Sequence, residues 1–150
     1  DDTQVMLAAL RDLGCVITQD AAVRIAIANE AGYDGAALHA PGGAVLYGHG
    51  DIDTFVLGYL AAFPDAEFQV ASARINREPE QPLRIAVRWS LSGTHGGFGH
   101  FGEPTGAPVY VMGMSHYHVT QGRVTSEYMV TDEVSIWKQI IAHAESRAGA

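Results

Sequence analysis

The chain of 150 residues contains a single cysteine, Cys15, so no disulfide can form within it and nothing demands an oxidising compartment. No apolar run approaches the roughly 20 residues of a membrane-spanning helix, and the opening residues lack the basic segment of a signal peptide. These absences predict a cytoplasmic protein. The chain begins with Asp-Asp rather than Met, which suggests a domain trimmed or excised from a longer protein.

Positive charge is scarce as well: nine Lys and Arg residues against 17 Asp and Glu give a formal net charge of -8. The cations are scattered along the sequence and never clustered, which argues against nucleic acid or an anionic membrane as a partner. The length fits one domain, residues 1–150, with a core large enough to enclose a small-molecule cavity. We therefore expect a small-molecule ligand, either neutral or met by a specific charged site.

The first third of the chain is predicted to be mainly helical. The segments "QVMLAALRDLG" and "TQDAAVRIAIANEAG" are predicted as two short helices that end near Gly14 and Gly32. Residues 35–48 follow, where small apolar residues around a Pro-Gly-Gly turn predict a strand, a turn and a second strand piece.

The clearest helical pattern runs from Ile52 to Phe63, where apolar residues recur at helical spacing. Asp51 or Asp53 is expected to cap its start, and Pro64 to end it. The period then changes to two, which predicts four long strands: "EFQVASARI", "LRIAVRWSLSG", "PVYVMGMSHYHVT" and "RVTSEYMVT". A helix over "EVSIWKQIIAHAES" follows, so the layout is α+β rather than an alternating βαβ fold.

Residues 93–106, "GTHGGFGHFGEPTG", contain the G-x-G-x-x-G spacing of a dinucleotide-binding loop. Such a loop functions only when it opens a helix whose N-terminus faces the pyrophosphate. Here Pro104, Gly106 and Pro108 come next and a strand follows them. The context therefore argues against a nucleotide site.

A metal site is an alternative for the "HYH" segment, because His116 and His118 lie two residues apart on a strand and project to one face. A site needs a third ligand, and the nearest carboxylates are Glu127 and Asp132. Their spacing fits no metal signature, so we expect no metal and no cofactor, with packed or cavity-lining histidines as the simpler interpretation.

Five motifs occur together in one order: "HAPGG", "LYGHG", "AFPDAEF", "AVRWSLSGTHGGFGHFGEPTG" and "GMSHYHVTQGRVTSEYMVTDEVSIWKQI". In this order, over residues 36–140, the chain resembles the SnoaL-like polyketide cyclase family of the NTF2-like superfamily. The resemblance implies a cone of curved antiparallel sheet, wrapped by N-terminal helices around a deep, mostly apolar pocket.

The resemblance also implies a function. Family cyclases close rings by an intramolecular aldol reaction without cofactor or metal, and use an acidic residue at the end of the last strand as general acid and base. Asp132 occupies that position, although a residue between a strand and a helix is also a natural N-cap. In an apolar pocket a carboxyl pKa rises towards working pH, which suits proton transfer next to a carbonyl.

Strand parity extends the candidate site. We interpret one side of the third strand as the pocket side, the side that carries Met112, Met114, His116 and His118. Both histidines are expected to be catalytic donors. The family commonly has an aliphatic residue at the first of these histidine positions and an arginine at the second. The expected substrate-binding residues are His39, Trp89, His95, Met114 and Tyr128. Trp89 could equally be plain core, and His95 could instead order the loop by a hydrogen bond.

The leading hypothesis is therefore a cofactor-independent enzyme that acts on a hydrophobic carbonyl compound as a cyclase or isomerase. The alternatives are a non-catalytic module for ligand binding or dimerisation, and a metal enzyme that uses the histidine pair. Exposed sheet faces in the superfamily usually pair, so we also expect a homodimer.

Overall fold

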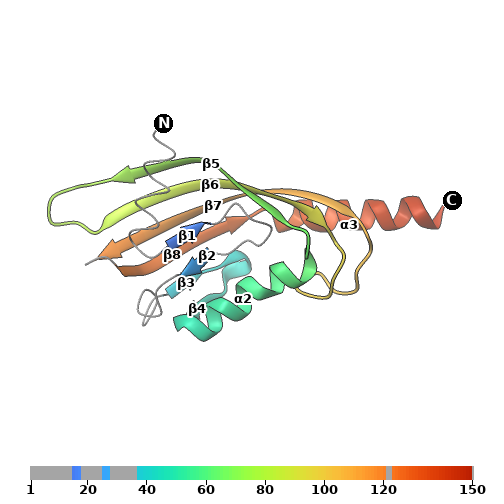
Figure 1. Ribbon diagram of the computed structural model, residues 1–150, viewed down its shortest axis with the longest axis horizontal. Helices are drawn as coiled ribbons and strands as arrows, with labels where there is room; N and C mark the ends of the chain where they lie inside the picture. The colour runs from blue at the N-terminus through green and yellow to red at the C-terminus, as the bar shows by residue number, and fades with distance from the viewer. Residues whose placement is uncertain (1–14, 18–24, 28–36, 121–122, 150) are drawn as a thin grey trace.

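A six-stranded curved sheet forms the centre of the structure, a computed structural model that describes residues 15–17, 25–27, 37–120 and 123–149 (Figure 1). The strands lie in the order β4-β3-β8-β7-β6-β5. Their bounds are β3 Ala37–His39, β4 Val45–Tyr47, β5 Glu67–Asn76, β6 Leu83–Thr94, β7 Pro108–Thr120 and β8 Arg123–Thr131. The four long strands are those that the period-two pattern predicts, and the α+β class is confirmed.

The pairing differs at one place from the curved antiparallel sheet that the family resemblance implies. Strands β5 to β8 form antiparallel neighbours, but β3 pairs with β8 in parallel, with Leu38 opposite Glu127. The sheet is therefore mixed. Strand β3 is three residues long and also pairs with β4 in an antiparallel hairpin around a short 3-10 turn, Pro41–Gly43.

The predicted second helix is wrong where the structure describes it. Ile25–Ile27 forms strand β2, which pairs antiparallel with β1, Cys15–Ile17. The local sequence Ile-Ala-Ile is β-branched at alternate positions, which favours a strand once a partner is present. The predicted first helix and the rest of the second lie outside the described residues.

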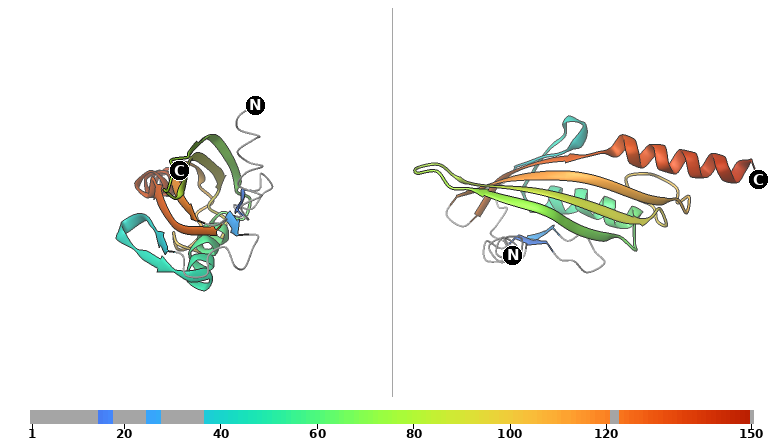
Figure 2. Two further views of the ribbon diagram at one scale, coloured as in Figure 1. Left: turned by 90° about the vertical axis from the view of Figure 1, so that its left-hand side faces the viewer. Right: turned by 90° about the horizontal axis from the view of Figure 1, so that it is seen from above.

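Helix α2, Gly48–Ala62, lies along one face of the sheet (Figures 1 and 2). Ile52, Tyr59 and Phe63 are buried in the common core with the sheet. The prediction that Pro64 follows the end of this helix is confirmed, but the predicted caps are wrong. The chain turns into the helix earlier, at Gly48 with φ 74°, so the residue in the N-cap position is Tyr47.

Helix α3, Glu133–Ala148, continues directly from β8 and runs beside the start of β7, past the end of the sheet (Figure 1). Asp132 caps it, because its carboxylate accepts a hydrogen bond from the Ser135 backbone N–H at 3.0 Å. Further along, the Gln139 amide accepts from the Tyr110 N–H at 2.9 Å and donates to the Tyr110 carbonyl at 2.8 Å. At Tyr110, where β7 extends past the end of β8, the side chain of Gln139 thus makes the hydrogen bonds that a neighbouring strand would otherwise make.

The burial pattern defines an inner and an outer face of the sheet. On β7 the inner residues include Val111, Ser115 and Tyr117, whereas Met112 and Met114 are more than half exposed. We call the side buried against α2 and the core the inner face, and the opposite side the outer face. No described helix is long and apolar enough to cross a membrane.

Candidate functional site

A small apolar cavity lies between α2 and the inner face of the sheet. Its volume is about 30 Å³, which is room for about two water molecules. A larger ligand requires side chains to move. The lining residues are Phe55, Val56, Tyr59, Phe68, Trp89, Leu91, Met129 and Thr131.

Two of the lining residues, Tyr59 and Thr131, carry a hydroxyl group, although the surface that the cavity exposes is apolar. The Tyr59 hydroxyl donates a hydrogen bond to the Glu133 carboxylate, and Thr131 lines the cavity nearby. Burial, and then the hydrogen bond and charge of Glu133, raise the pKa of Tyr59 far above its usual value. Tyr59 therefore remains a protonated donor, held against a carboxylate at the edge of an apolar space.

Trp89 is the predicted binding residue that does lie at this cavity. Its ring packs on Phe68 with the centroids 5.3 Å apart, and its indole N–H donates to the buried Ser115 hydroxyl at 3.1 Å. A side chain added at Gly113 would collide with the indole ring. Trp89 is thus both core and cavity wall, because its ring is fixed from three sides.

A buried carboxyl, Glu127, lies further along the inner face. It is 1% exposed and stands opposite the buried Tyr117 in the β7–β8 register. The sequence analysis considered Glu127 only as a third ligand for a metal site. Its alternation with Met129 and Thr131 along β8 is the signal that could have placed it inside.

The structure brings four other predicted residues together, but on the outer face. His39 stacks on Tyr128 at 4.4 Å between ring centroids, and His118 lies 5.6 Å from Tyr128 and 5.2 Å from His116. Met114, 56% exposed, lies on the same face. The prediction that this side of β7 and β8 faces the pocket is therefore wrong. The buried residues are those that alternate with it along both strands.

Asp132 does not converge with that histidine cluster. It lies four residues beyond Tyr128, which is about 13 Å along a strand, and its exposed carboxylate is engaged as the cap of α3. The neighbouring Glu133 carboxylate accepts the hydrogen bond of Tyr59, which lines the cavity. In the described part of the chain, no three His, Cys, Asp or Glu residues lie close enough together to hold a metal ion.

His95 is fully buried beneath the glycine-rich loop. Its Nδ1 lies 3.0 Å from the Thr105 hydroxyl, its ring packs against Phe63, and its backbone N–H donates to Ala107 at 2.8 Å. The loop-ordering hydrogen bond that we predicted as the alternative to a binding role is present. His95 therefore fixes both ends of the loop from inside the core.

The glycine-rich loop itself packs on the end of α2. The backbone N–H groups of Gly96 and Gly97 donate to the Ala62 carbonyl at 3.2 and 3.3 Å, and the His100 ring lies against Gly58. These contacts satisfy a carbonyl that the helix end would otherwise leave without a partner. The loop is thus a C-terminal cap for the helix that covers the cavity.

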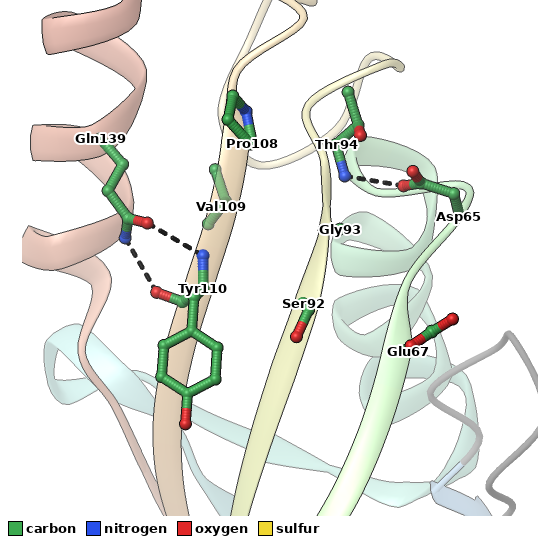
Figure 3. Close-up of a pocket in the computed structure, with 9 residues that line it drawn as sticks. All are labelled: Asp65, Glu67, Ser92, Gly93, Thr94, Pro108, Val109, Tyr110 and Gln139. Atoms are coloured by element: carbon green, nitrogen blue, oxygen red, sulfur yellow. Dashed lines mark hydrogen bonds between the residues drawn. The ribbon is translucent and has the colours of Figure 1, made fainter.

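A shallow groove of about 450 Å³ lies at the rim, where β5, β6 and β7 meet α3 (Figure 3). The Asp65 carboxylate accepts a hydrogen bond from the Thr94 backbone N–H at 2.7 Å, and this bond lowers the pKa of Asp65. Glu67 of β5 and Tyr110 of β7 line the same groove from the two strands that flank β6.

Replacing Asp65 with asparagine should remove an acid-sensitive part of the stability. Because the folded pKa lies below the ordinary 3.8, the charged carboxylate stabilises the fold above that pH and loses this effect as pH falls through the lowered pKa. Melting temperatures between pH 7 and pH 2 should show Asp65→Asn below wild type at neutral pH and converging with it in acid. A Glu67→Gln variant controls for the loss of one charge from the same groove; a constant offset of Asp65→Asn at every pH would contradict the expectation.

The curved mixed sheet, the helix over its inner face and the apolar cavity between them define an α+β protein of the NTF2-like fold. Within this class, the family model for the SnoaL-like polyketide cyclase matches residues 23–140, and the chain belongs to this family. A comparison with curated protein sequences gives no match.

Solved structures share the fold. A protein of Jannaschia sp. CCS1, provisionally described as a SnoaL-like polyketide cyclase, is 20% identical over 71% of both chains with a TM-score of 0.60. IdmH of Streptomyces antibioticus, which is also provisionally described as a polyketide cyclase, is 21% identical to this chain. The match covers 93% of this chain and 96% of IdmH, with a TM-score of 0.58. A protein of Acidithiobacillus ferrooxidans with the same provisional description is 19% identical over 94% of both chains, with a TM-score of 0.60.

Proposed function

We propose that the protein moves a proton next to a carbonyl group in a hydrophobic substrate, as an aldol cyclisation or an isomerisation requires. The observation that carries this proposal is the hydrogen bond to Glu133 from Tyr59, a residue that lines an apolar cavity. Membership of the SnoaL-like polyketide cyclase family supports the same class of chemistry.

The two groups have complementary roles in this proposal. The Glu133 carboxylate takes the α proton, and the Tyr59 hydroxyl turns from Glu133 to donate to the carbonyl oxygen as it gains enolate charge. The raised pKa of Tyr59 keeps its proton in place for that task. The apolar walls of the cavity strengthen both interactions because they exclude water.

Asp132 remains a second candidate for the acid and base, because it occupies the position that the family resemblance indicates. Its exposure and its capping bond to Ser135 make Glu133 the better placed of the two. His116 and His118 lie on the outer face, so the proposal assigns them no part in the chemistry of the cavity.

The proposal predicts catalysed exchange of α protons. Cyclic aryl ketones and 1,3-diketones in heavy water should lose their α-proton NMR signals faster with the protein than without it, and the rate should saturate with ketone. Saturable binding without faster exchange would favour the alternative of a non-catalytic binding module.

The homodimer stays a prediction. Met112, Met114 and Val130 expose more than half of their surface on the outer face, which is the kind of apolar patch that a partner covers. Light scattering on the purified chain measures its mass in solution directly.

A further inference from the structure

The outer face of the sheet carries a groove that the chemistry of the cavity does not use. The strand register places Arg74, Ala86 and His116 in one row across β5, β6 and β7, and Arg84 beside His118 in the next row. Between these rows lies a groove of about 160 Å³. Its lining residues are Arg74, Ile75, Asn76, Arg84, Ala86 and His116.

The fold gathers positive charge here that the sequence leaves dispersed. Arg74, Arg84 and Arg88 come from two strands, and the register places all three on the outer face of a chain whose net charge is -8. Among the described residues, one salt bridge involves these arginines: the Glu78 carboxylate lies 2.9 Å from the Arg84 guanidinium. Three guanidinium groups with one carboxylate leave this end of the sheet electropositive.

The titration of His118 supports a positive local field. Burial lowers the pKa of His118, and the neighbouring His116 and Arg84 lower it further. Cations disfavour an added proton on the imidazole. The same field attracts a bound anion.

The geometry of the groove suits an oxyanion. Ala86 is a small floor residue between the Arg74 and His116 positions, which leaves space above it for a ligand. A guanidinium presents a planar fork of N–H donors that matches the oxygens of phosphate and carboxylate groups. The Nε atom of Arg84 is buried and has no hydrogen-bond partner in the described part of the chain.

We propose that this groove is a second binding site, on the face opposite the cavity, for a small ligand that carries an oxyanion, either a phosphate ester or a carboxylate. Its volume is below the 300 Å³ or so of a typical small-molecule pocket, so it holds the anionic head of a ligand rather than a whole large one. The site is independent of the acid and base chemistry proposed for the cavity.

Calorimetric titration with inorganic phosphate and with succinate tests the proposal and separates the two ligand classes. Saturable binding of either anion is expected, and the tighter one identifies the class. Arg74→Ser should weaken binding about tenfold or more, because it removes a charged donor from the groove. Ala86→Leu should weaken it similarly without changing any charge, because the larger side chain fills the floor.

Arg88→Ser is the matched control, because it removes the same charge from the same face but outside the groove lining. It should change the affinity by no more than about twofold. A second readout is the pKa of His118, followed by NMR in sulfate: bound sulfate should raise it, and Ala86→Leu should abolish the rise. Absence of saturable binding of both anions, or equal weakening by Arg88→Ser and Arg74→Ser, would overturn the proposal.

Discussion

Replacing Glu133 with glutamine is expected to slow α-proton exchange of a bound ketone by about 100-fold or more, the usual contribution of a general base. The amide oxygen of glutamine still accepts the hydrogen bond from Tyr59, so the contact at the cavity persists while its basicity is lost. The free energy of unfolding should fall by at most about 1 kcal/mol, the usual value of a negative charge in the first turn of a helix. Exchange rates from NMR and a melting curve measure the two effects.

Asp132→Asn is the paired variant, because asparagine caps a helix about as well as aspartate does. If Glu133 is the base, this variant keeps most of the exchange activity. If the family position determines the chemistry, Asp132→Asn loses the activity and Glu133→Gln keeps it, which would refute our assignment while leaving the proposed reaction intact. Loss of melting temperature together with activity in either variant would point to a structural role.

Replacing Gly99 with alanine is expected to destabilise the fold by about 3 kcal/mol, the upper part of the range for overpacking. A β-carbon at this position would press on the Gly58 carbonyl oxygen and lie 2.8 Å from the Ala62 nitrogen. Both are backbone atoms of α2, so the conflict is relieved only if the loop or the helix moves. The melting temperature should fall by roughly 10 °C, by the usual scaling for a chain of this length.

Gly96→Ala provides the control in the same loop. The nearest atom to a β-carbon there is 3.7 Å away, an ordinary contact distance, so the melting temperature should change little. Equal destabilisation by the two variants would mean that alanine disturbs the loop wherever it stands. It would contradict the explanation from close packing on α2.

The periodicity of the sequence was sufficient to predict the long strands and both described helices. The long strands alternate apart from a bulge in β5 and an irregularity at the end of β7, and the stripe from Ile52 to Phe63 matches one helical face. Asp132 caps α3, which we had considered as the alternative to its catalytic role. These elements are determined by local patterns. Strand β2 and its pairing with β1 could not be predicted in this way, because a segment of three residues is too short for its periodicity to distinguish a helix from a strand.

Periodicity could not decide which side of β7 faces inward. Tyr110, Met112 and Met114 are as apolar as Val109 and Val111, so each face alone looks like a core face. The structure places the valines inside and the other set outside, which moves the histidines away from the cavity. A similar lack of contrast between the faces of β8 hid Glu127, whereas the family resemblance directed attention to Asp132 instead of Glu133.

The parallel pairing of β3 with β8 has a consequence for the order of assembly. Leu38 and Glu127 are neighbours in the sheet although nearly 90 positions separate them along the chain. On a ribosome the β3–β4 hairpin and α2 emerge long before β8 exists, whereas the meander of β5, β6 and β7 can form from local pairing alone. We therefore expect the β3–β4 hairpin to join the sheet only after translation has passed residue 131, so this side of the sheet is completed late in folding.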